Sequence, residues 1–198
     1  MKVALIGLKG HYGTVLEGLQ ETGSRLVAVC DDNPDVLAGV PRWPTADTET
    51  KTYTDYRDLL DREQVDLVGE SGVDSQRGEI IRACAERGVH VLAEKPLACD
   101  LEELAAVRQA VAQSGIQVSM LLTMRFEPAY RLLRQCVQEG LIGEICQGAM
   151  QKSYRLGNRP AWQRDRRTFS GIIPFIGVHA LDLISWTSGR QFVRGAAF

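Results

Sequence analysis

The sequence has little of what disulfide scaffolds, secreted proteins or membrane spans are made from. Its five cysteines are widely spread with no C-x-x-C pair, which favours reduced thiols over disulfides or a zinc site, so no metal centre is expected. The first apolar run, Val3–Ile6, is too short for a signal peptide, and no later segment is long and apolar enough to span a bilayer. We therefore expect a soluble, cytoplasmic protein.

An excess of charge of one sign is also missing. Lys and Arg total 23 and Asp and Glu total 25, giving a net charge of −2 over 198 residues. This balance gives no general reason to expect nucleic acid or an anionic membrane as a partner. Hydrophobic residues make up 44% of the chain, which is enough to fill a core and excludes a wholly disordered chain.

Short apolar runs alternate with helical patterns over the first part of the chain. Buried strands are expected at 3–6, 26–30, 65–68, 89–93 and 117–122, and helices at 15–22, 54–60, 76–87 and 100–113, with a loop at 40–50. Asp100 and Glu103 have the spacing of a capping box at the start of the last helix. This alternation predicts an α/β fold with a doubly wound parallel sheet, connected by right-handed crossovers.

The pattern changes after Met124, so we expect a first domain at 1–122 and a second at 123–198. Helices are expected at 128–139 and 177–186, a long strand at Gly143–Tyr154, and strand-like chain at 191–198. The second domain is expected to be the start of an α+β open-sheet domain. Two strands make a marginal sheet with open edges, so we expect either a truncated chain or a homo-oligomer that completes the sheet.

A glycine-rich turn connects the first strand to the first helix. Gly7, Gly10 and Gly13 form G-x-x-G-x-x-G, one residue longer than the usual G-x-G-x-x-G, and such a turn binds pyrophosphate through backbone N–H groups and the helix dipole. Asp31, at the end of the second strand, can accept hydrogen bonds from the adenosine ribose and would repel a 2′-phosphate. The pattern favours NAD over NADP, unless Asp31 merely caps a turn.

Two further segments carry residues suited to proton chemistry. Lys95, in Glu94-Lys95-Pro96, follows a predicted strand and would project into the ligand crevice, where a lysine can polarise a carbonyl or help move a proton. The alternative is an ordinary surface lysine. His179 and Asp182 share one helix face and could be a base and its orienting carboxylate, although a histidine on an apolar helix is more often a packed residue.

Together these segments resemble the Gfo/Idh/MocA oxidoreductases, over essentially the whole chain. The matching segments are 7–13, Asp31, 88–96, Arg125 with Pro128, Gly140 with Gly143, and 177–182. The resemblance implies a Rossmann domain that carries NAD or NADP, joined to an α/β domain with a large open sheet. It also implies oxidation or reduction of a hydroxyl or carbonyl on a sugar or cyclitol, with Lys95 and His179 as active-site residues.

The chain departs from the family pattern at three places. Phe175 stands where the family usually has an aspartate, four residues before the histidine, so the usual Lys-Asp-His set is incomplete. The common glycine pair is Ser170-Gly171. The Thr-Pro-Asn turn after the fourth strand, which in the family lies beside the nicotinamide, is replaced, together with the histidine that follows it, by Gly72-Val73-Asp74 and Arg77.

The loop at 154–167 is rich in arginine. Its cations could clamp a carboxylate or phosphate, but we favour a solvated loop whose charges pair with Asp165 and other acids. Aromatic residues among these arginines are not taken as a nucleic-acid site, because the overall charge does not support one.

The function expected from the sequence is NAD-dependent hydride transfer to or from a sugar-like polyol or its keto form. The expected catalytic residues are Lys95, His179 and Asp182, and the expected cofactor-binding residues are Gly7, Gly10, Gly13, Asp31, Glu94 and Lys95. A related reductase or lyase that uses bound NAD is the runner-up among enzymes. The rival from another class is a non-catalytic dinucleotide-binding sensor or subunit, which Phe175 favours and the retention of Lys95 and His179 disfavours.

Overall fold

The computed structural model describes residues 1–155 and 157–196, which form two compact units. The first unit comprises Met1–Leu121 and Pro160–Ser170, and the second comprises Leu122–Arg159 and Gly171–Phe198. The main division lies next to the boundary expected at residue 122. The short segment Pro160–Ser170 belongs with the first unit, although it follows the start of the second in the chain.

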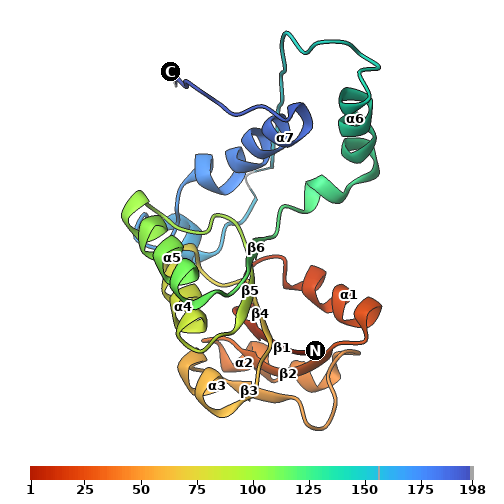
Figure 1. Cartoon of the computed structure of the whole chain (residues 1–198). Helices are drawn as coiled ribbons and strands as arrows, with labels where there is room; N and C mark the ends of the chain where they lie inside the picture. The colour runs from red at the N-terminus through yellow and green to blue at the C-terminus, as the bar shows by residue number, and fades with distance from the viewer. Residues whose placement is uncertain (156, 197–198) are drawn as a thin grey trace. The chain divides into compact units, whose positions relative to one another are not determined.

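A six-stranded parallel sheet forms the centre of the first unit (Figure 1). Its strands are β1 (Lys2–Ile6), β2 (Arg25–Cys30), β3 (Lys51–Tyr53), β4 (Leu67–Glu70), β5 (His90–Ala93) and β6 (Val118–Met120). They lie in the order β3-β2-β1-β4-β5-β6, and every neighbouring pair is parallel. The predicted doubly wound parallel sheet is confirmed. The strand order reverses between β1 and β4, where sheets of this kind bind their ligands.

Helices cover both faces of this sheet (Figure 1). They are α1 (Tyr12–Thr22), α2 (Pro34–Leu37), α3 (Tyr56–Arg62), α4 (Asp74–Glu86) and α5 (Leu101–Ser114). On one face, Val15 and Leu19 of α1 pack in an apolar cluster with Leu5 of β1. On the other, Ile81 of α4 and Val107 of α5 belong to a second cluster. The apolar runs that predicted the strands are buried on both sides because each face has its own core.

The ends of the helices follow the sequence signals in most places. Gly23 and Gly115 have φ of +63° and +72° and end α1 and α5 in the left-handed conformation that glycine adopts without strain. Asp100 accepts a hydrogen bond of 2.8 Å from the Glu103 N–H, as a capping box requires. A capping box also predicts a hydrogen bond from the Asp100 N–H to the Glu103 carboxylate. That part of the prediction is wrong, because the Glu103 carboxylate accepts from the Cys99 N–H instead, at 2.7 Å.

Several short elements of the first unit lie outside the predicted ones, including α2 and a 3₁₀ turn at Ala161–Arg164. Strand β3 lies at an edge of the sheet and carries exposed and half-buried side chains, so it has no apolar run to reveal it. A single 3₁₀ turn, Val40–Arg42, interrupts the predicted loop at 40–50. In the described ranges no helix combines the length and the apolar character needed to cross a membrane.

The second unit contains the two predicted helices, α6 (Pro128–Gln138) and α7 (Val178–Ser188). A 3₁₀ turn at Thr123–Phe126 precedes α6, and a π-helical turn at Ile173–Gly177 leads into α7. The strand predicted at Gly143–Tyr154 is wrong, since that segment has no regular structure. Residues 191–196 form no strand either, and 197–198 lie outside the described residues. A strand needs a paired neighbour, and the described part of this unit supplies none.

Candidate functional site

The glycine-rich turn after β1 is pressed against the turn after β4, at the point where the strand order reverses. Gly7 has φ +79°, and a Cβ at this position would lie 2.3 Å from the Cα of Gly72, so only glycine fits. The N–H groups of Lys9 and Gly10 donate to the carbonyl of Ser71 at 2.9 and 3.0 Å. Backbone contacts therefore fix the turn before any ligand binds.

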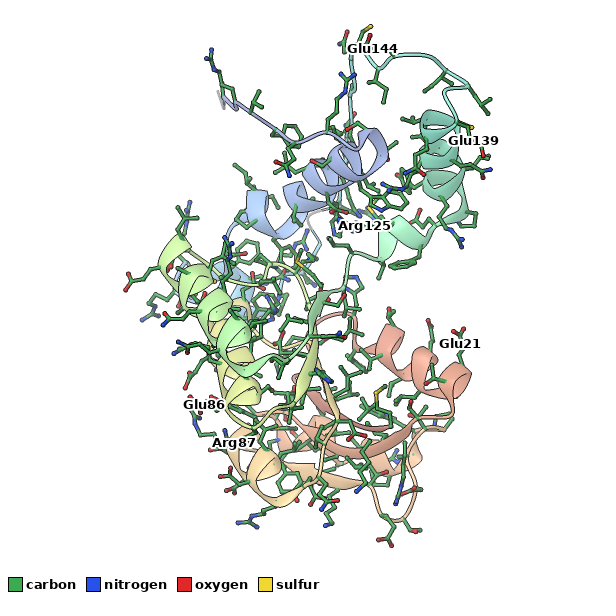
Figure 2. The ribbon with its side chains drawn as sticks, in the orientation of Figure 1. Glu21, Glu86, Arg87, Arg125, Glu139 and Glu144 are labelled. Atoms are coloured by element: carbon green, nitrogen blue, oxygen red, sulfur yellow. The ribbon has the colours of Figure 1, made fainter. Side chains whose placement is uncertain are left out.

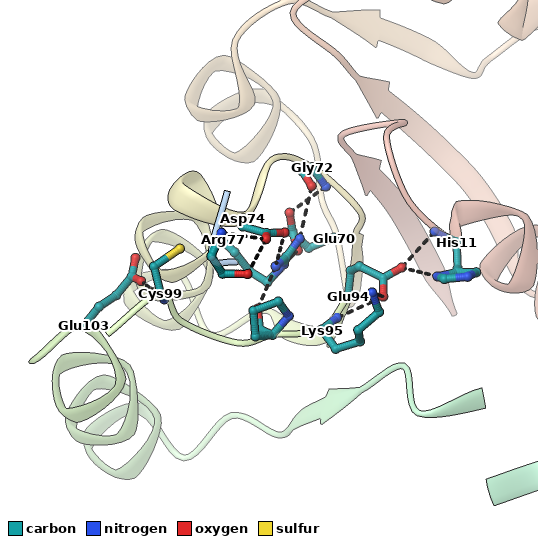
Figure 3. Close-up of polar contacts among 11 residues, drawn as sticks. His11, Glu70, Gly72, Asp74, Arg77, Glu94, Lys95, Cys99 and Glu103 are labelled. Atoms are coloured by element: carbon teal, nitrogen blue, oxygen red, sulfur yellow. Dashed lines mark hydrogen bonds and ion pairs between the residues drawn. The ribbon is translucent and has the colours of Figure 1, made fainter. Parts of the chain in front are cut away.

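Glu94, which follows β5, holds the same turn from the other side (Figure 3). Its Oε2 accepts from the backbone N–H of His11 at 2.9 Å and from the imidazole Nδ1 at 2.5 Å. A Cβ on Gly10 would lie 2.7 Å from this oxygen. Burial alone would raise the pKa of Glu94, but the His11 hydrogen bonds outweigh it and lower that pKa to about 2. Glu94 thus acts on the glycine turn as a fixed negative charge.

The start of α1 supplies donors for an anion. In the described chain, the side chain of the N-cap residue His11 forms no capping hydrogen bond to this helix, and the first turn contains no acidic residue. A Cβ on Gly13 would meet nothing within 4 Å, so the approach to this end of the helix is open. Uncapped N–H groups and the positive end of the helix dipole suit a diphosphate. The residues present therefore fit the dinucleotide that the sequence predicted.

A cavity of about 240 Å³ lies beside this turn, at the ends of β1 and β2, and Asp31 and Asp32 line it. The Asp31 carboxylate, 2% exposed, accepts hydrogen bonds from the N–H of Leu8 at 2.8 Å and of Asn33 at 2.9 Å. Asp31 also accepts from Lys9 Nζ at 2.8 Å. Asp31 thus caps the turn at Asn33 and also lines the cavity, and its role toward the adenosine ribose stays a prediction.

Lys95 is buried, which excludes the interpretation of an ordinary surface lysine. Lys95 is 3% exposed, and its Nζ lies 3.9 Å from Oε1 of Glu94. The Lys95 N–H donates to the same oxygen at 3.0 Å, and the bond from Lys95 to Pro96 is cis. The residue follows β5 at the carboxyl end of the sheet, as predicted from its place after a strand.

Arg77, one of the departures from the family pattern, is the centre of a fully buried network (Figure 3). Its Nε donates to Glu70 at 2.5 Å, and its Nη1 lies 3.3 Å from Asp74. The guanidinium also donates to the carbonyls of Pro96 at 2.6 Å and Gly72 at 3.1 Å. Arg77 therefore ties the turn after β4 to the segment after β5. The sequence shows the substitution but not this role, because the direction of the Arg77 side chain and its contact with Pro96 depend on the fold.

Asp74 extends this network to the segment that returns to the first unit. The hydroxyl of Ser170 donates to Asp74 Oδ2 at 2.6 Å, and the Ser170 N–H donates to the same oxygen at 3.2 Å. Ser170 is the first residue of the pair that stands where the family has two glycines. In this chain the serine supplies a hydroxyl that a glycine lacks.

The other predicted catalytic residues lie on α7 of the second unit. His179 is 5% exposed. Asp182 accepts hydrogen bonds from two nitrogens of Arg125, one of them at 2.8 Å from Nε (Figure 2 labels Arg125). Both oxygens of Asp182 thus have a positively charged partner within the unit. Its predicted role in orienting His179 stays a prediction.

Phe175 and the arginine-rich loop complete the comparison with the sequence. Phe175 is half-buried and lies in the π-helical turn before α7. In the loop, Arg167 forms an ion pair with Asp165 at 2.6 Å, as the solvated-loop interpretation predicted.

The matches to protein-family models follow the same division as the structure. Residues 1–122 match a model described as an oxidoreductase family with an NAD-binding Rossmann fold, and residues 130–198 match the GFO/IDH/MocA C-terminal domain. The chain belongs to the Gfo/Idh/MocA oxidoreductase family. The family that the sequence resembled is confirmed.

Two curated relatives and one solved structure are similar to this chain over most of its length. Inositol 2-dehydrogenase 2 of Saccharopolyspora erythraea is 29% identical over all of this chain and 56% of its own length. Levoglucosan dehydrogenase of Pseudarthrobacter phenanthrenivorans is 28% identical over 82% of this chain and 42% of its own. The structure of a putative oxidoreductase from Thermotoga maritima has a TM-score of 0.83 at 28% identity, covering 97% of this chain and 60% of that one. The chain spans about half the length of the curated relatives it matches.

Proposed function

We propose that the protein is an NAD-dependent oxidoreductase that transfers hydride between nicotinamide and a hydroxyl or carbonyl of a sugar or cyclitol. The observation that carries this proposal is the geometry at the strand-order reversal. There a fixed glycine turn leads to an uncapped helix, and buried Lys95 follows the neighbouring strand β5. Relatives named for inositol and levoglucosan support the substrate class.

The cofactor would be held by residues of the first unit. The N–H groups at the start of α1 would bind the diphosphate, and Asp31 would accept hydrogen bonds from the adenosine ribose. The buried negative charge of Asp31 favours NAD over NADP, because a 2′-phosphate beside it would be repelled. When bound, the cofactor supplies the redox chemistry, and the chain supplies orientation and proton management.

The proton would be managed by residues of both units. Lys95 would polarise the reacting oxygen or share in proton transfer. Because Lys95 is buried, little water reaches its ammonium group to compete with the substrate oxygen. His179 would act as the general base in the direction of oxidation, with Asp182 orienting it or binding substrate.

We also propose that the protein is cytoplasmic and forms a homo-oligomer. Light scattering coupled to size-exclusion chromatography would measure its assembly.

Phe175 favours a second candidate, a dinucleotide-binding sensor or subunit without catalysis, since phenylalanine can neither carry a proton nor hold a hydroxyl. Mixing the protein with NAD and a panel of inositols, anhydrosugars and aldoses, while following the absorbance of reduced cofactor, separates the two. If the protein is an enzyme, we expect at least one polyol to reduce NAD to NADH, and we expect Lys95→Ala to lose this activity. NAD binding without turnover of any member of the panel would favour the sensor.

A further inference from the structure

Lys9, in the glycine-rich turn, has its ammonium group between the two carboxylates at the end of β2. Its Nζ lies 2.8 Å from Asp31 Oδ1 and 2.8 Å from Asp32 Oδ1. The Lys9 side chain is 24% exposed, against 1% for Asp31 and 72% for Asp32. All three residues line the cavity of about 240 Å³. A cation is therefore built into the place where a carboxylate was expected to act alone.

Lys9 and Asp31 each carry their charge at neutral pH. Burial would lower the pKa of Lys9, but the hydrogen bonds with Asp31 and Asp32 outweigh it and raise that pKa. Burial would likewise raise the pKa of Asp31, while its bonds from Lys9 and from the N–H groups of Asn33 and Leu8 lower it. The formal charge of the three side chains is −1, whereas the two aspartates without Lys9 would give −2.

Lys9 also takes up hydrogen-bonding capacity that a ribose would use. A carboxylate has about four acceptor positions, and Asp31 already accepts from Lys9, Leu8 and Asn33. Only about one acceptor position of Asp31 is left. A ribose diol that forms two hydrogen bonds to Asp31 must therefore take the position that the Lys9 ammonium occupies. A displaced Lys9 remains within reach of whatever group the ribose 2′-oxygen carries.

We propose that Lys9 is a specificity-determining residue for the adenosine ribose, which lets this chain bind a 2′-phosphorylated nucleotide with only a moderate loss relative to its unphosphorylated counterpart. The inference rests on the proposed function, because it assumes that the cavity holds the adenosine half of the dinucleotide. Lys9 offsets the repulsion from Asp31 and Asp32 and offers the phosphate a counter-charge. NAD is still preferred, but NADP is accepted.

Arg57 is the competing cation, since it lines the same cavity. Its guanidinium forms an ion pair with Glu79 and lies 4.5 Å from the ring centroid of Tyr56. A phosphate would have to compete with Glu79 for it. Lys9 is bonded directly to Asp31, the residue that repels the phosphate, so the repulsion and its compensation are coupled at Lys9.

Calorimetric titration of the full chain with AMP and with adenosine 2′,5′-bisphosphate tests this proposal without any turnover. Removing a charge within contact distance of a phosphate weakens binding about tenfold, and the effect falls as salt is raised. In Lys9→Gln we expect the dissociation constant for the bisphosphate, divided by that for AMP, to rise about tenfold. Lys9→Arg keeps the charge and should restore the ratio. Lys51→Gln, which removes an exposed lysine paired with Glu63, is the matched control and should leave it unchanged.

The outcomes separate the two proposals. An unchanged ratio in Lys9→Gln, or a ratio that shifts only in Arg57→Gln, overturns the role of Lys9 and leaves the dinucleotide site intact. Binding of neither nucleotide to the folded wild-type chain overturns both. Circular dichroism of each variant establishes that it is folded.

Discussion

The two units of this protein differ in how much of their apolar surface they cover. The first has a sheet with helices and a hydrophobic cluster on each face, and even its buried charges have partners. In the second, helix α6 has no buried residue, and Leu132, Leu133, Leu141 and Ile142 are exposed. Exposed apolar surface of this kind is typical of sites where protein surfaces interact.

The difference shows which part of the proposed activity each unit supports. The glycine turn, Asp31, Glu94 and Lys95 all lie in the first unit, and their hydrogen bonds are formed within it. His179 and Asp182 lie in the second, where the described residues include no strand. We therefore expect dinucleotide binding to depend on the first unit, and substrate chemistry to depend on both.

Replacing the proposed proton-handling residues should have the largest effect. Lys95→Ala and His179→Ala should each lower turnover by about 10²–10⁴-fold, because general acid–base groups contribute that much to rate. Their dissociation constants for NADH should change far less. Steady-state kinetics and fluorescence titration measure the two quantities. Full turnover in Lys95→Ala would show that this lysine has no catalytic role.

Arg77→Ala should be the most destabilising single change in the first unit. It leaves the buried carboxylates of Glu70 and Asp74 without their cation, and breaking a buried pair costs about 3–5 kcal/mol. Urea unfolding of the variant measures this loss. The control is Arg25→Ala, which removes the exposed pair with Asp47 and should cost far less, because solvent screens that pair. Equal losses in both would mean that the Arg77 network adds no stability.

One leucine from each unit tests the contrast between them directly. Leu59 is fully buried on α3, and its change to alanine should lower the free energy of unfolding by about 2–5 kcal/mol. Leu132, 61% exposed on α6, should change stability by less than about 0.5 kcal/mol. Thermal and urea unfolding give both values. A loss at Leu132 as large as that at Leu59 would contradict this contrast between the two units.

Glu94 predicts an acid-dependent loss of stability. Its pKa falls from 4.5 to about 2 on folding, so the stabilisation is complete above pH 4.5 and is lost as the pH falls toward 2. A shift of this size corresponds to about 3 kcal/mol. Glu94→Gln should be less stable than wild type at pH 7 and should lose less between pH 4.5 and 2. Parallel pH curves for the two proteins would contradict this assignment.

The sequence predicted the elements whose signal is local. Apolar runs identified β1, β2, β4 and β5, and glycines marked the ends of α1 and α5. Strand β3 was missed because an exposed edge strand has no such run. The strand expected at Gly143–Tyr154 is wrong because strand formation depends on a distant partner, which no local pattern reveals.

The candidate site was predictable to a similar extent. Its glycines and acidic residues follow strands, so their location was visible in the sequence. The bonds of Lys9 to Asp31 and of Arg77 to Pro96 depend on how separate turns meet in the fold. Sequence spacing gave the residues of the first unit but not their partners.

Titration of NADH into the full chain, followed by calorimetry, tests the central claim that the first unit holds a dinucleotide. We expect saturable binding with one NADH per chain, lost in Gly7→Val, where a side chain would meet the backbone of Gly72. Glu21→Gln, on the same helix α1 but exposed, is the matched control and should bind as wild type does. A folded wild-type chain that gives no saturable binding at millimolar NADH would contradict the account.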